Sequence, residues 1–227
     1  MPLPPVLAID GPSGSGKGTV CRRVAAALGW HLLDSGALYR LVAHGAAAVG
    51  VAATDEAGHA AYARSMDVVF GATPSGDERI LLGGLEVASA IRTELAGAAA
   101  SRVAAWPAVR AALVERQRAF AVAPGLVADG RDMGSIIFPE AGLKVFLTAS
   151  AEERAARRHK QLMEKGINAN LATLSLEIAE RDRRDATRPV APLVATPDAI
   201  TIDSTSLSPD AVVAQVLSLA RARFGVG

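Results

Sequence analysis

The chain has 227 residues, half of them apolar, and a formal net charge of +1. A chain of this length and composition can bury a substantial core, which excludes the disordered class of proteins and suits one domain carrying a smaller insertion. A net charge near zero gives no overall field to attract nucleic acid or a membrane surface, so we expect neither as a partner.

The amino terminus, Met1-Pro-Leu-Pro-Pro, has no basic segment followed by a long apolar run, so it predicts neither a secretory signal nor an anchor. The weakly apolar stretch from Leu41 to Ala53 is too short to cross a bilayer. We therefore expect a cytoplasmic protein. The single cysteine, Cys21, excludes an internal disulfide framework.

Two strand-to-helix units open the predicted fold. The apolar run Val6–Ile9 leads into Asp10-Gly11, as a buried strand that stops at a glycine-rich turn would. A helix follows, and Gly29 stands where a left-handed C-cap is expected. Its apolar face consists of Val20, Val24 and Leu28.

The second unit repeats this pattern. The segment from Trp30 to Leu33 predicts a strand, and a helix is expected from Asp34-Ser35-Gly36 to about Val49. A strand, helix, strand, helix rhythm is typical of a parallel sheet.

The pattern changes between about residues 63 and 100. Three strands are predicted, at Met66–Phe70, Arg79–Leu82 and Leu85–Ile91, with Gly83-Gly84 as a hairpin turn. This part of the chain is therefore predicted to be an antiparallel insert.

The alternating pattern then resumes. Three further strands are predicted at Leu126–Ala128, Lys144–Thr148 and Ala199–Ile202, which makes five parallel strands in all. The last helix is predicted to begin with Ser208 as N-cap and Pro209 at the first helical position. Its buried stripe comprises Val212, Val213, Val216, Leu217 and Ala220.

The strongest chemical signal is the run Gly11-Pro12-Ser13-Gly14-Ser15-Gly16-Lys17-Gly18-Thr19, which follows a predicted strand and opens a predicted helix. Glycines let backbone N–H groups point into one concavity, and the helix N-terminus adds partial positive charge. Lys17 can reach the β and γ phosphates of a nucleotide. The general pattern has Ser or Thr directly after the lysine, whereas this chain has Gly18 there and Thr19 one position later. We therefore expect Mg²⁺ to be contacted through water, and we assign no residue as a direct metal ligand.

Other polar residues stand where a site could form. Arg131 and Asp132 follow a predicted strand, and sites in parallel sheets lie beyond the carboxyl ends of strands, although Asp129 beside them can be a turn residue only. A helix would place Arg181, Asp185 and Arg188 on one face, which is equally typical of a solvated ladder of ion pairs.

A helix predicted from about Ala151 carries three arginines on one face, namely Arg154, Arg157 and Arg158. They could close over a transferring phosphoryl group. The alternative is a solvated basic face paired with the glutamates of the same segment.

The Gly-Lys-Gly-Thr form of the phosphate loop resembles nucleoside monophosphate kinases. The segments Asp34-Ser-Gly-Ala-Leu-Tyr-Arg40 and Ala128-Asp-Gly-Arg-Asp-Met133 narrow the resemblance to bacterial cytidylate kinases. Further matches lie at Ala100-Ser-Arg-Val-Ala-Ala, at Arg116-Gln-Arg-Ala-Phe and at Glu180-Arg-Asp-Arg-Arg-Asp185 with the following Arg188-Pro-Val-Ala-Pro-Leu. The resemblance thus covers nearly the whole chain.

This resemblance implies an α/β fold, a P-loop NTPase core with a five-stranded parallel sheet flanked by helices. It also implies an antiparallel β insert in the nucleoside monophosphate region and a short helical lid. We expect a single kinase domain over 1–227, with its core at 1–62, 101–150 and 187–227. The insert would lie at about 63–100, and the lid with the following helix at about 151–186. The implied activity is phosphorylation of CMP and dCMP by ATP with Mg²⁺, carried out by a monomer.

The resemblance also implies residue roles. Ser35 and Arg40 are expected at the acceptor nucleotide, with Arg40 on its phosphate, and Arg181 and Asp185 at the ribose. The residues expected around the cytosine are Ser101, Arg110, Asp132 and Arg188. Those expected to act in catalysis are Lys17, Arg131, Asp132 and Arg157, and Arg131 is also expected to bind the substrate.

Two alternatives remain open. One is a P-loop kinase for another small acceptor, such as UMP, dTMP or a non-nucleotide alcohol. The other is a regulatory GTPase, but guanine selection commonly uses an Asn-Lys-x-Asp segment and no lysine of this chain follows an asparagine. The four histidines show no metal-ligand spacing, which argues against a structural zinc site.

Overall fold

The computed structural model describes residues 4–72, 78–164 and 166–226. Part of the expectation for the amino terminus, which concerns residues 1–3, lies outside them. The chain divides into two compact units. We call Met1–Asp34 with Gln117–Gly227 the core unit and Ser35–Arg116 the helical unit.

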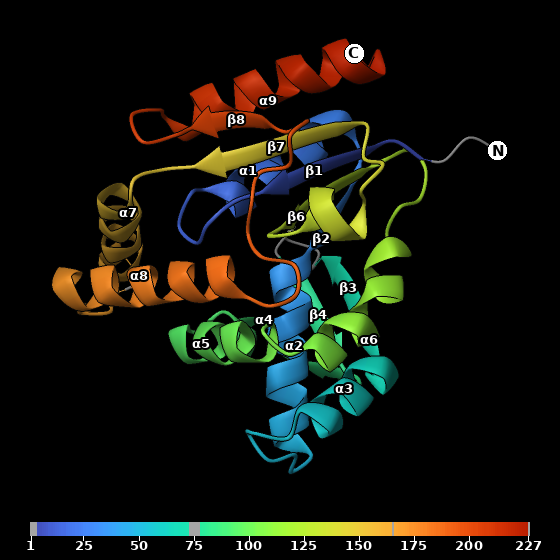
Figure 1. The fold of residues 1–227 in the computed structure, drawn as a ribbon, viewed down its shortest axis with the longest axis vertical. Helices are drawn as coiled ribbons and strands as arrows, with labels where there is room; N and C mark the ends of the chain where they lie inside the picture. The colour runs from blue at the N-terminus through green and yellow to red at the C-terminus, as the bar shows by residue number, and fades with distance from the viewer. Residues whose placement is uncertain (1–3, 73–77, 165, 227) are drawn as a thin grey trace. The chain divides into compact units, whose positions relative to one another are not determined.

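The core unit is built on a parallel sheet with the strand order β2-β6-β1-β7-β8 (Figure 1). The strands are β1 Val6–Asp10, β2 His31–Asp34, β6 Leu126–Gly130, β7 Leu143–Thr148 and β8 Ile200–Asp203. The prediction of five parallel strands is confirmed, and most of the predicted bounds differ from the observed ones by a residue or two. The central strand β1 is buried along its whole length, as expected of a strand covered on both faces.

Helices α1 Lys17–Leu28 and α9 Pro209–Phe224 share a hydrophobic core with β1 and β7. Both predicted helix boundary signals are confirmed. Gly29 adopts the left-handed conformation at φ 64°, and its N–H bonds the carbonyls of the last turn of α1. The hydroxyl of Ser208 accepts a hydrogen bond from the Ala211 N–H, with Pro209 at the start of α9.

Three further helices lie in the described part of the core unit. Helix α7 Ala151–Glu164 packs beside helix α8 Leu171–Thr187 (Figure 1), whose first turn is capped by the side chain of Asn170. A π-helix, η1 Met133–Ile137, follows β6 directly. Nothing in the residue pattern after Asp132 predicted this π-helix.

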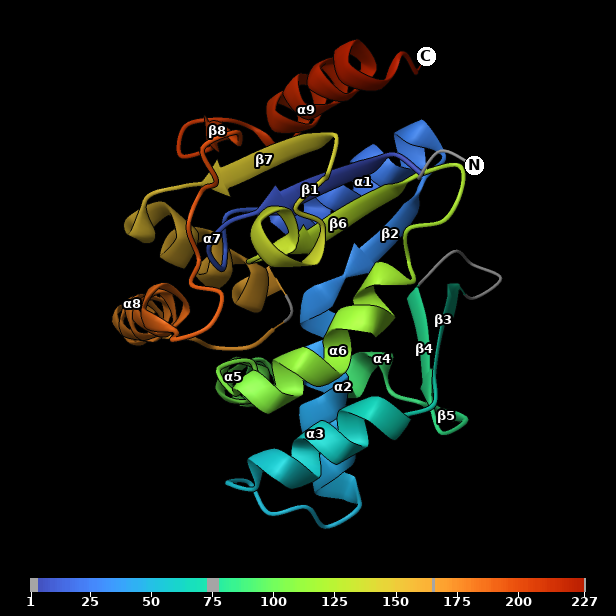
Figure 2. The ribbon, with the colours of Figure 1, turned by 45° about the vertical axis from the view of Figure 1, so that its right-hand side comes forward.

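The helical unit contains a small antiparallel sheet of the order β3-β4-β5 (Figure 2). Its strands are β3 Val68–Ala72, β4 Glu78–Leu82 and β5 Leu85–Glu86, and its helices are α2 Ser35–Ala48, α3 Glu56–Ser65, α4 Ala88–Ile91, α5 Glu94–Val103 and α6 Pro107–Arg118, whose last two residues belong to the core unit. The antiparallel sheet, helix α2 and the Gly83-Gly84 turn are confirmed, the latter with φ of 55° and 80°. The helices α3 to α6 have no counterpart among the predicted elements.

Two predicted strands of this unit were wrong in extent. The strand predicted at Leu85–Ile91 stops at Glu86, because the Glu86 carboxylate accepts hydrogen bonds from the N–H groups of Ile80 and Ala88, both at 3.1 Å. The second of these bonds holds Ala88, the first residue of the short helix α4, where the chain leaves the sheet. The first strand begins at Val68 rather than Met66, because Met66 is the C-cap of α3.

Among the residues that the structure describes, no helix combines the length and the apolarity that crossing a membrane requires.

Candidate active site

The glycine-rich loop joins β1 to α1 at the carboxyl end of the sheet, where sites form in parallel α/β proteins. Gly14 and Gly16 have φ of 79° and 92°, which disfavours a side chain there. A Cβ atom at Gly11 would overlap the backbone carbonyl of Leu147. The loop conformation and its contact with β7 therefore both require glycines at the predicted positions.

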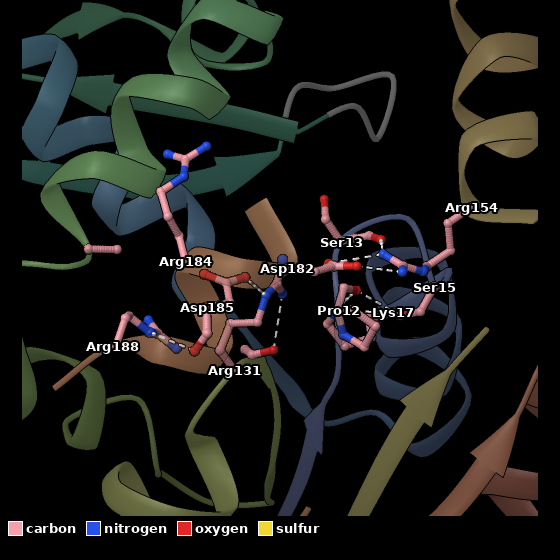
Figure 3. Close-up of polar contacts among 12 residues, drawn as sticks. Pro12, Ser13, Ser15, Lys17, Arg131, Arg154, Asp182, Arg184, Asp185 and Arg188 are labelled. Atoms are coloured by element: carbon pink, nitrogen blue, oxygen red, sulfur yellow. Dashed lines mark hydrogen bonds and ion pairs between the residues drawn. The ribbon is translucent and has the colours of Figure 1, made fainter. Parts of the chain in front are cut away.

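Lys17 is buried within this loop, with 5% of its surface exposed. Its Nζ donates to the Pro12 carbonyl at 2.7 Å and to Ser15 Oγ at 3.4 Å, while Ser15 Oγ donates to the same carbonyl at 3.0 Å (Figure 3). Burial lowers the pKa of Lys17 to about 7, with the charge of Arg131 acting in the same direction and that of Asp129 opposing it. The ammonium group therefore lies in a place where an added anion would stabilise its charge.

Two carboxylates at the ends of neighbouring strands lie close to Lys17. Asp129, near the end of β6, has its pKa raised to about 6 by burial, while the charge of Lys17 opposes the shift. Asp10, at the end of β1, has its pKa raised to about 6 by burial, although the N–H groups of Gly134 and Met133 both bond it at 2.8 Å. Sequence reasoning gave Asp10 no role and left Asp129 as a turn residue. The shared signal was an acidic residue at the end of each of two apolar runs.

Asp185 on helix α8 brings several predicted site residues together. Its carboxylate pairs with Arg131 at 3.0 Å, and Arg188 Nε donates to its backbone carbonyl at 3.3 Å (Figure 3). Burial acts to raise the pKa of Asp185, but the charges of Arg131, Arg188 and Arg181 outweigh it and hold the pKa below its usual value. The charges of three guanidinium groups thus act on one carboxylate, and two of these groups contact Asp185 directly.

The predicted helix face over Arg181, Asp185 and Arg188 was partly wrong. Helix α8 ends at Thr187, and Arg188 is its C-cap residue with an extended conformation (φ −57°, ψ 134°). The helix stops there because Pro189 follows and disfavours helical geometry in the residue before it. Arg188 still reaches Asp185, whereas Arg184 points away from it (Figure 3).

The arginines of helix α7 have separate partners. Arg154 is buried and donates to the Ser13 carbonyl of the glycine loop and to Asp182 of α8, both at 3.0 Å (Figure 3). Arg157 donates to Glu153 at 2.8 Å and to Ser204 Oγ at 3.1 Å, and Arg158 donates to Gln161. The Arg154 contact with the phosphate loop was missed, because helical spacing alone cannot tell which arginine of one face reaches it.

Ser204, directly after β8, is a second connection to the loop that sequence reasoning missed. Its hydroxyl lies 3.2 Å from the Ser15 carbonyl and 2.9 Å from the Thr148 carbonyl of β7, and 2% of the residue is exposed. A serine at this place resembles any loop residue in the sequence, so no signal distinguished it.

The remaining predicted residues belong to the helical unit. Ser35 and Arg40 lie on α2, which packs against α5, the helix that carries Ser101. Arg110 on α6 is buried, donates to the Ala104 carbonyl at 3.2 Å, and has its guanidinium 5.8 Å from the ring centre of Tyr39 on α2. Within this unit the predicted residues therefore lie on three helices, two of which are linked by the Arg110–Tyr39 contact.

The sequence model of the family described as cytidylate kinase matches residues 7–222 of the chain. The chain belongs to the cytidylate kinase family. Cytidylate kinase of Methylococcus capsulatus is 57% identical over 215 residues, which cover 95% of this chain and 96% of that protein. Cytidylate kinase of Azotobacter vinelandii is 56% identical over 221 residues, 97% and 96% of the two chains. Cytidylate kinase of Pseudomonas aeruginosa is 58% identical over 214 residues, 94% and 93%. The resemblance to bacterial cytidylate kinases is thereby confirmed, and the alternative of a regulatory GTPase is not supported.

Proposed function

We propose that this cytidylate kinase family member transfers the γ-phosphoryl group of ATP to CMP and dCMP, which yields CDP and dCDP. The observation that carries the proposal is the match to proteins named cytidylate kinase over at least 93% of both chains. The cytoplasmic location and the monomeric state remain predictions.

The donor site in this proposal is the loop from Gly11 to Thr19. Its glycine conformations and the start of α1 suit backbone N–H groups to bind a polyphosphate. Lys17 Nζ would exchange the Pro12 carbonyl for the β and γ phosphate oxygens, because a full negative charge attracts the ammonium group more strongly than a carbonyl dipole does.

The residues present suit Mg²⁺ as the companion of ATP. Gly18 stands where the general loop pattern has a hydroxyl, and a Cβ built there would lie 3.5 Å from Asp129 Oδ2. The Asp129 carboxylate therefore occupies the neighbourhood of the missing hydroxyl. We propose that Asp129 and Thr19 orient the water molecules around the cation. When bound, the cation supplies charge neutralisation for the phosphates.

The acceptor phosphate of a monophosphate has a second pKa of about 6, so its attacking oxygen is already anionic near pH 7 and no dedicated general base is needed. Catalysis then depends on positioning and on cancelling charge between two anions. We propose that Lys17 and Arg131 perform the cancellation, together with Asp132 as an acceptor-side residue and Arg157 after rearrangement of its contacts with Ser204.

We propose the acceptor roles that the resemblance implies. Cytosine presents an amino donor beside an unprotonated ring nitrogen, and its recognition needs one acceptor and one donor. Asp132, Ser101 and Arg110 supply these types, and Arg188 completes the base site. Ser35, Arg40, Arg181 and Asp185 are assigned to the phosphate and the ribose.

A coupled assay of ADP release with CMP, dCMP, UMP and dTMP tests the function. We expect kcat/KM for CMP and dCMP to exceed that for UMP by about 10- to 100-fold, because a buried acceptor left unpaired by the wrong base costs about 1 to 3 kcal/mol. A higher kcat/KM with UMP or dTMP than with either cytidine nucleotide would contradict the proposal. It would favour the alternative of a P-loop kinase for another small acceptor.

A further inference from the structure

Asp10 holds the backbone that carries Asp132. The residue ends the central strand β1 and is 8% exposed. Its Oδ1 accepts from the Met133 N–H and its Oδ2 from the Gly134 N–H, both at 2.8 Å. These two amides are the first of the π-helix η1, so one carboxylate satisfies two donors at the start of that helix.

Because Asp10 accepts these two hydrogen bonds, the side chain of Asp132 is not needed to cap η1. Asp132 is itself the N-cap residue of η1, a position at which an aspartate commonly accepts hydrogen bonds from the first amides of its own helix. In the described core unit no side-chain capping bond links Asp132 to η1. Asp10, at the end of β1, accepts the hydrogen bonds from these amides instead.

Pairing between β1 and β6 fixes the position of Asp10 relative to the backbone of Asp132. Strands β1 and β6 pair in parallel with Asp10 opposite Gly130, two residues before Asp132. The backbone of η1 also approaches closely: a Cβ built on Gly134 would lie 3.4 Å from Asp10 Oδ2 and 3.1 Å from Lys144 Cδ. The backbone of η1 therefore packs directly on the side chains of Asp10 and Lys144, so a change in the Asp10 side chain acts on η1.

We infer that Asp10 is a positioning residue, whose carboxylate fixes the amides of Met133 and Gly134 and thereby the direction of the Asp132 side chain toward the acceptor base. This inference rests on the proposed function, in which Asp132 reads the cytosine. Asp10 touches neither nucleotide in this scheme. Its substitution should therefore affect discrimination between acceptors more than binding of ATP.

The test is the substitution Asp10→Asn, which keeps the shape but leaves one acceptor oxygen and turns an NH₂ group toward a backbone N–H. We expect the ratio of kcat/KM for CMP over UMP to fall about tenfold, in line with the loss of one buried hydrogen bond, while KM for ATP changes by a smaller factor. A double-mutant cycle with Asp132→Asn decides the mechanism. If Asp10 acts through Asp132, Asp10→Asn has no further effect on the ratio in the Asp132→Asn background.

Two further variants serve as controls. Val216→Ala removes volume from the core between α9 and the sheet, so it lowers stability while the CMP over UMP ratio stays unchanged. Gly134→Ala introduces a Cβ beside Asp10 Oδ2 and should lower the ratio in the same direction as Asp10→Asn, which keeps the test informative if Asp10→Asn does not fold.

An unchanged ratio in folded Asp10→Asn, or in Gly134→Ala when Asp10→Asn does not fold, overturns the inference. The inference is also overturned if Asp10→Asn lowers the CMP over UMP ratio by the same factor in the Asp132→Asn background as in the unsubstituted protein. Failure of the proposed function is distinguishable from both, because the unsubstituted enzyme would then show no preference for CMP at all.

Discussion

At the scale of single residues, the core unit buries ionisable side chains where its sheet ends. Asp10, Lys17 and Asp185 are each exposed by 8% or less, and the pKa of Asp129 is also raised by burial. Burial disfavours the charged forms of Asp10, Lys17 and Asp129. It raises the pKa of the two carboxyl groups to about 6 and lowers that of Lys17 to about 7. Such shifts concentrate at functional sites, and here they surround the glycine loop.

Substitution of Lys17 should separate catalysis from folding. We expect Lys17→Ala to lower kcat by about 10²- to 10³-fold, because one preorganised charge at the transferring group is lost. Its free energy of unfolding should change little by comparison, since burial already disfavours the ammonium group. The measurements are the ADP-release assay and urea unfolding of the same samples.

Lys144→Met provides the matched control for that substitution. Lys144 is also a buried lysine, but it lies on β7 and pairs with Asp198 at 2.8 Å. This variant should keep kcat, and because Asp198 is largely exposed its free energy of unfolding should change by less than about 1 kcal/mol. A near-normal kcat in purified Lys17→Ala would contradict the catalytic role.

The pKa of Lys17 also predicts a proton linkage. Its value of about 7 lies below the ordinary value of 10.5, so at pH 8 most of the protein without nucleotide carries a neutral Lys17. A bound polyphosphate favours the ammonium form and raises this pKa, so binding at pH 8 should take up nearly one proton, and affinity should fall as the pH rises above about 7.

Titration calorimetry with metal-free ATP in two buffers of different ionisation enthalpy measures that uptake. Lys17→Arg is the control, because a guanidinium stays charged throughout this range and should take up no proton. Equal binding enthalpies for the unsubstituted protein in both buffers would refute the linkage.

At the scale of elements, helices α7 and α8 are joined to the glycine loop by one buried group. Arg154 of α7 contacts the Ser13 carbonyl and Asp182 of α8 with the same Nη1 atom. A second ion pair on α8, between Glu180 and Arg183, lies on the exposed surface. The acidic partners Asp182 and Glu180 lie on the same helix but their ion pairs differ in burial, which allows a direct comparison.

We expect Asp182→Ala to lower the free energy of unfolding by about 1 to 3 kcal/mol, because it leaves the buried Arg154 without its charged acceptor. KM for ATP should rise as well, since the Ser13 carbonyl loses a fixed donor. Glu180→Ala should cost less than about 1 kcal/mol, as exposed pairs do, and leave KM for ATP unchanged. Urea unfolding and initial rates measure both quantities. Equal effects of the two variants would show that the Arg154 contact does not brace the loop.

Local patterns predicted the elements of the core unit better than those of the helical unit. The strand β1 and the caps Gly29 and Ser208 depend on neighbours within a few residues, so the sequence reveals them. The end of β5 depends on Glu86 reaching back to Ile80, and β-propensity alone favoured a longer strand. The π-helix η1 depends on Asp10, which stands more than 120 positions earlier in the chain.

At the scale of the whole chain, the resemblance to the family predicted which residues form the site, and the structure shows which side chains and carbonyls they contact. The glycine loop was predictable because a strand, a run of glycines, a lysine and a helix coincide. The contacts of Arg154 and Ser204 with that loop join segments far apart in the sequence. No spacing rule covers such pairs, since they depend on how the ends of β7 and β8 and the start of α7 are arranged.

These long-range contacts engage backbone carbonyl oxygens of the glycine loop. The carbonyl oxygens of Ser13 and Ser15 accept hydrogen bonds from Arg154 and Ser204, and that of Pro12 accepts from Ser15 Oγ as well as from Lys17. Three peptide units of the loop therefore have their negative poles engaged by side chains of the protein, and the Ser15 hydroxyl would still bond the Pro12 carbonyl after Lys17 had turned to a phosphate. The loop would thus meet each incoming triphosphate with these oxygens already occupied before the anion arrives.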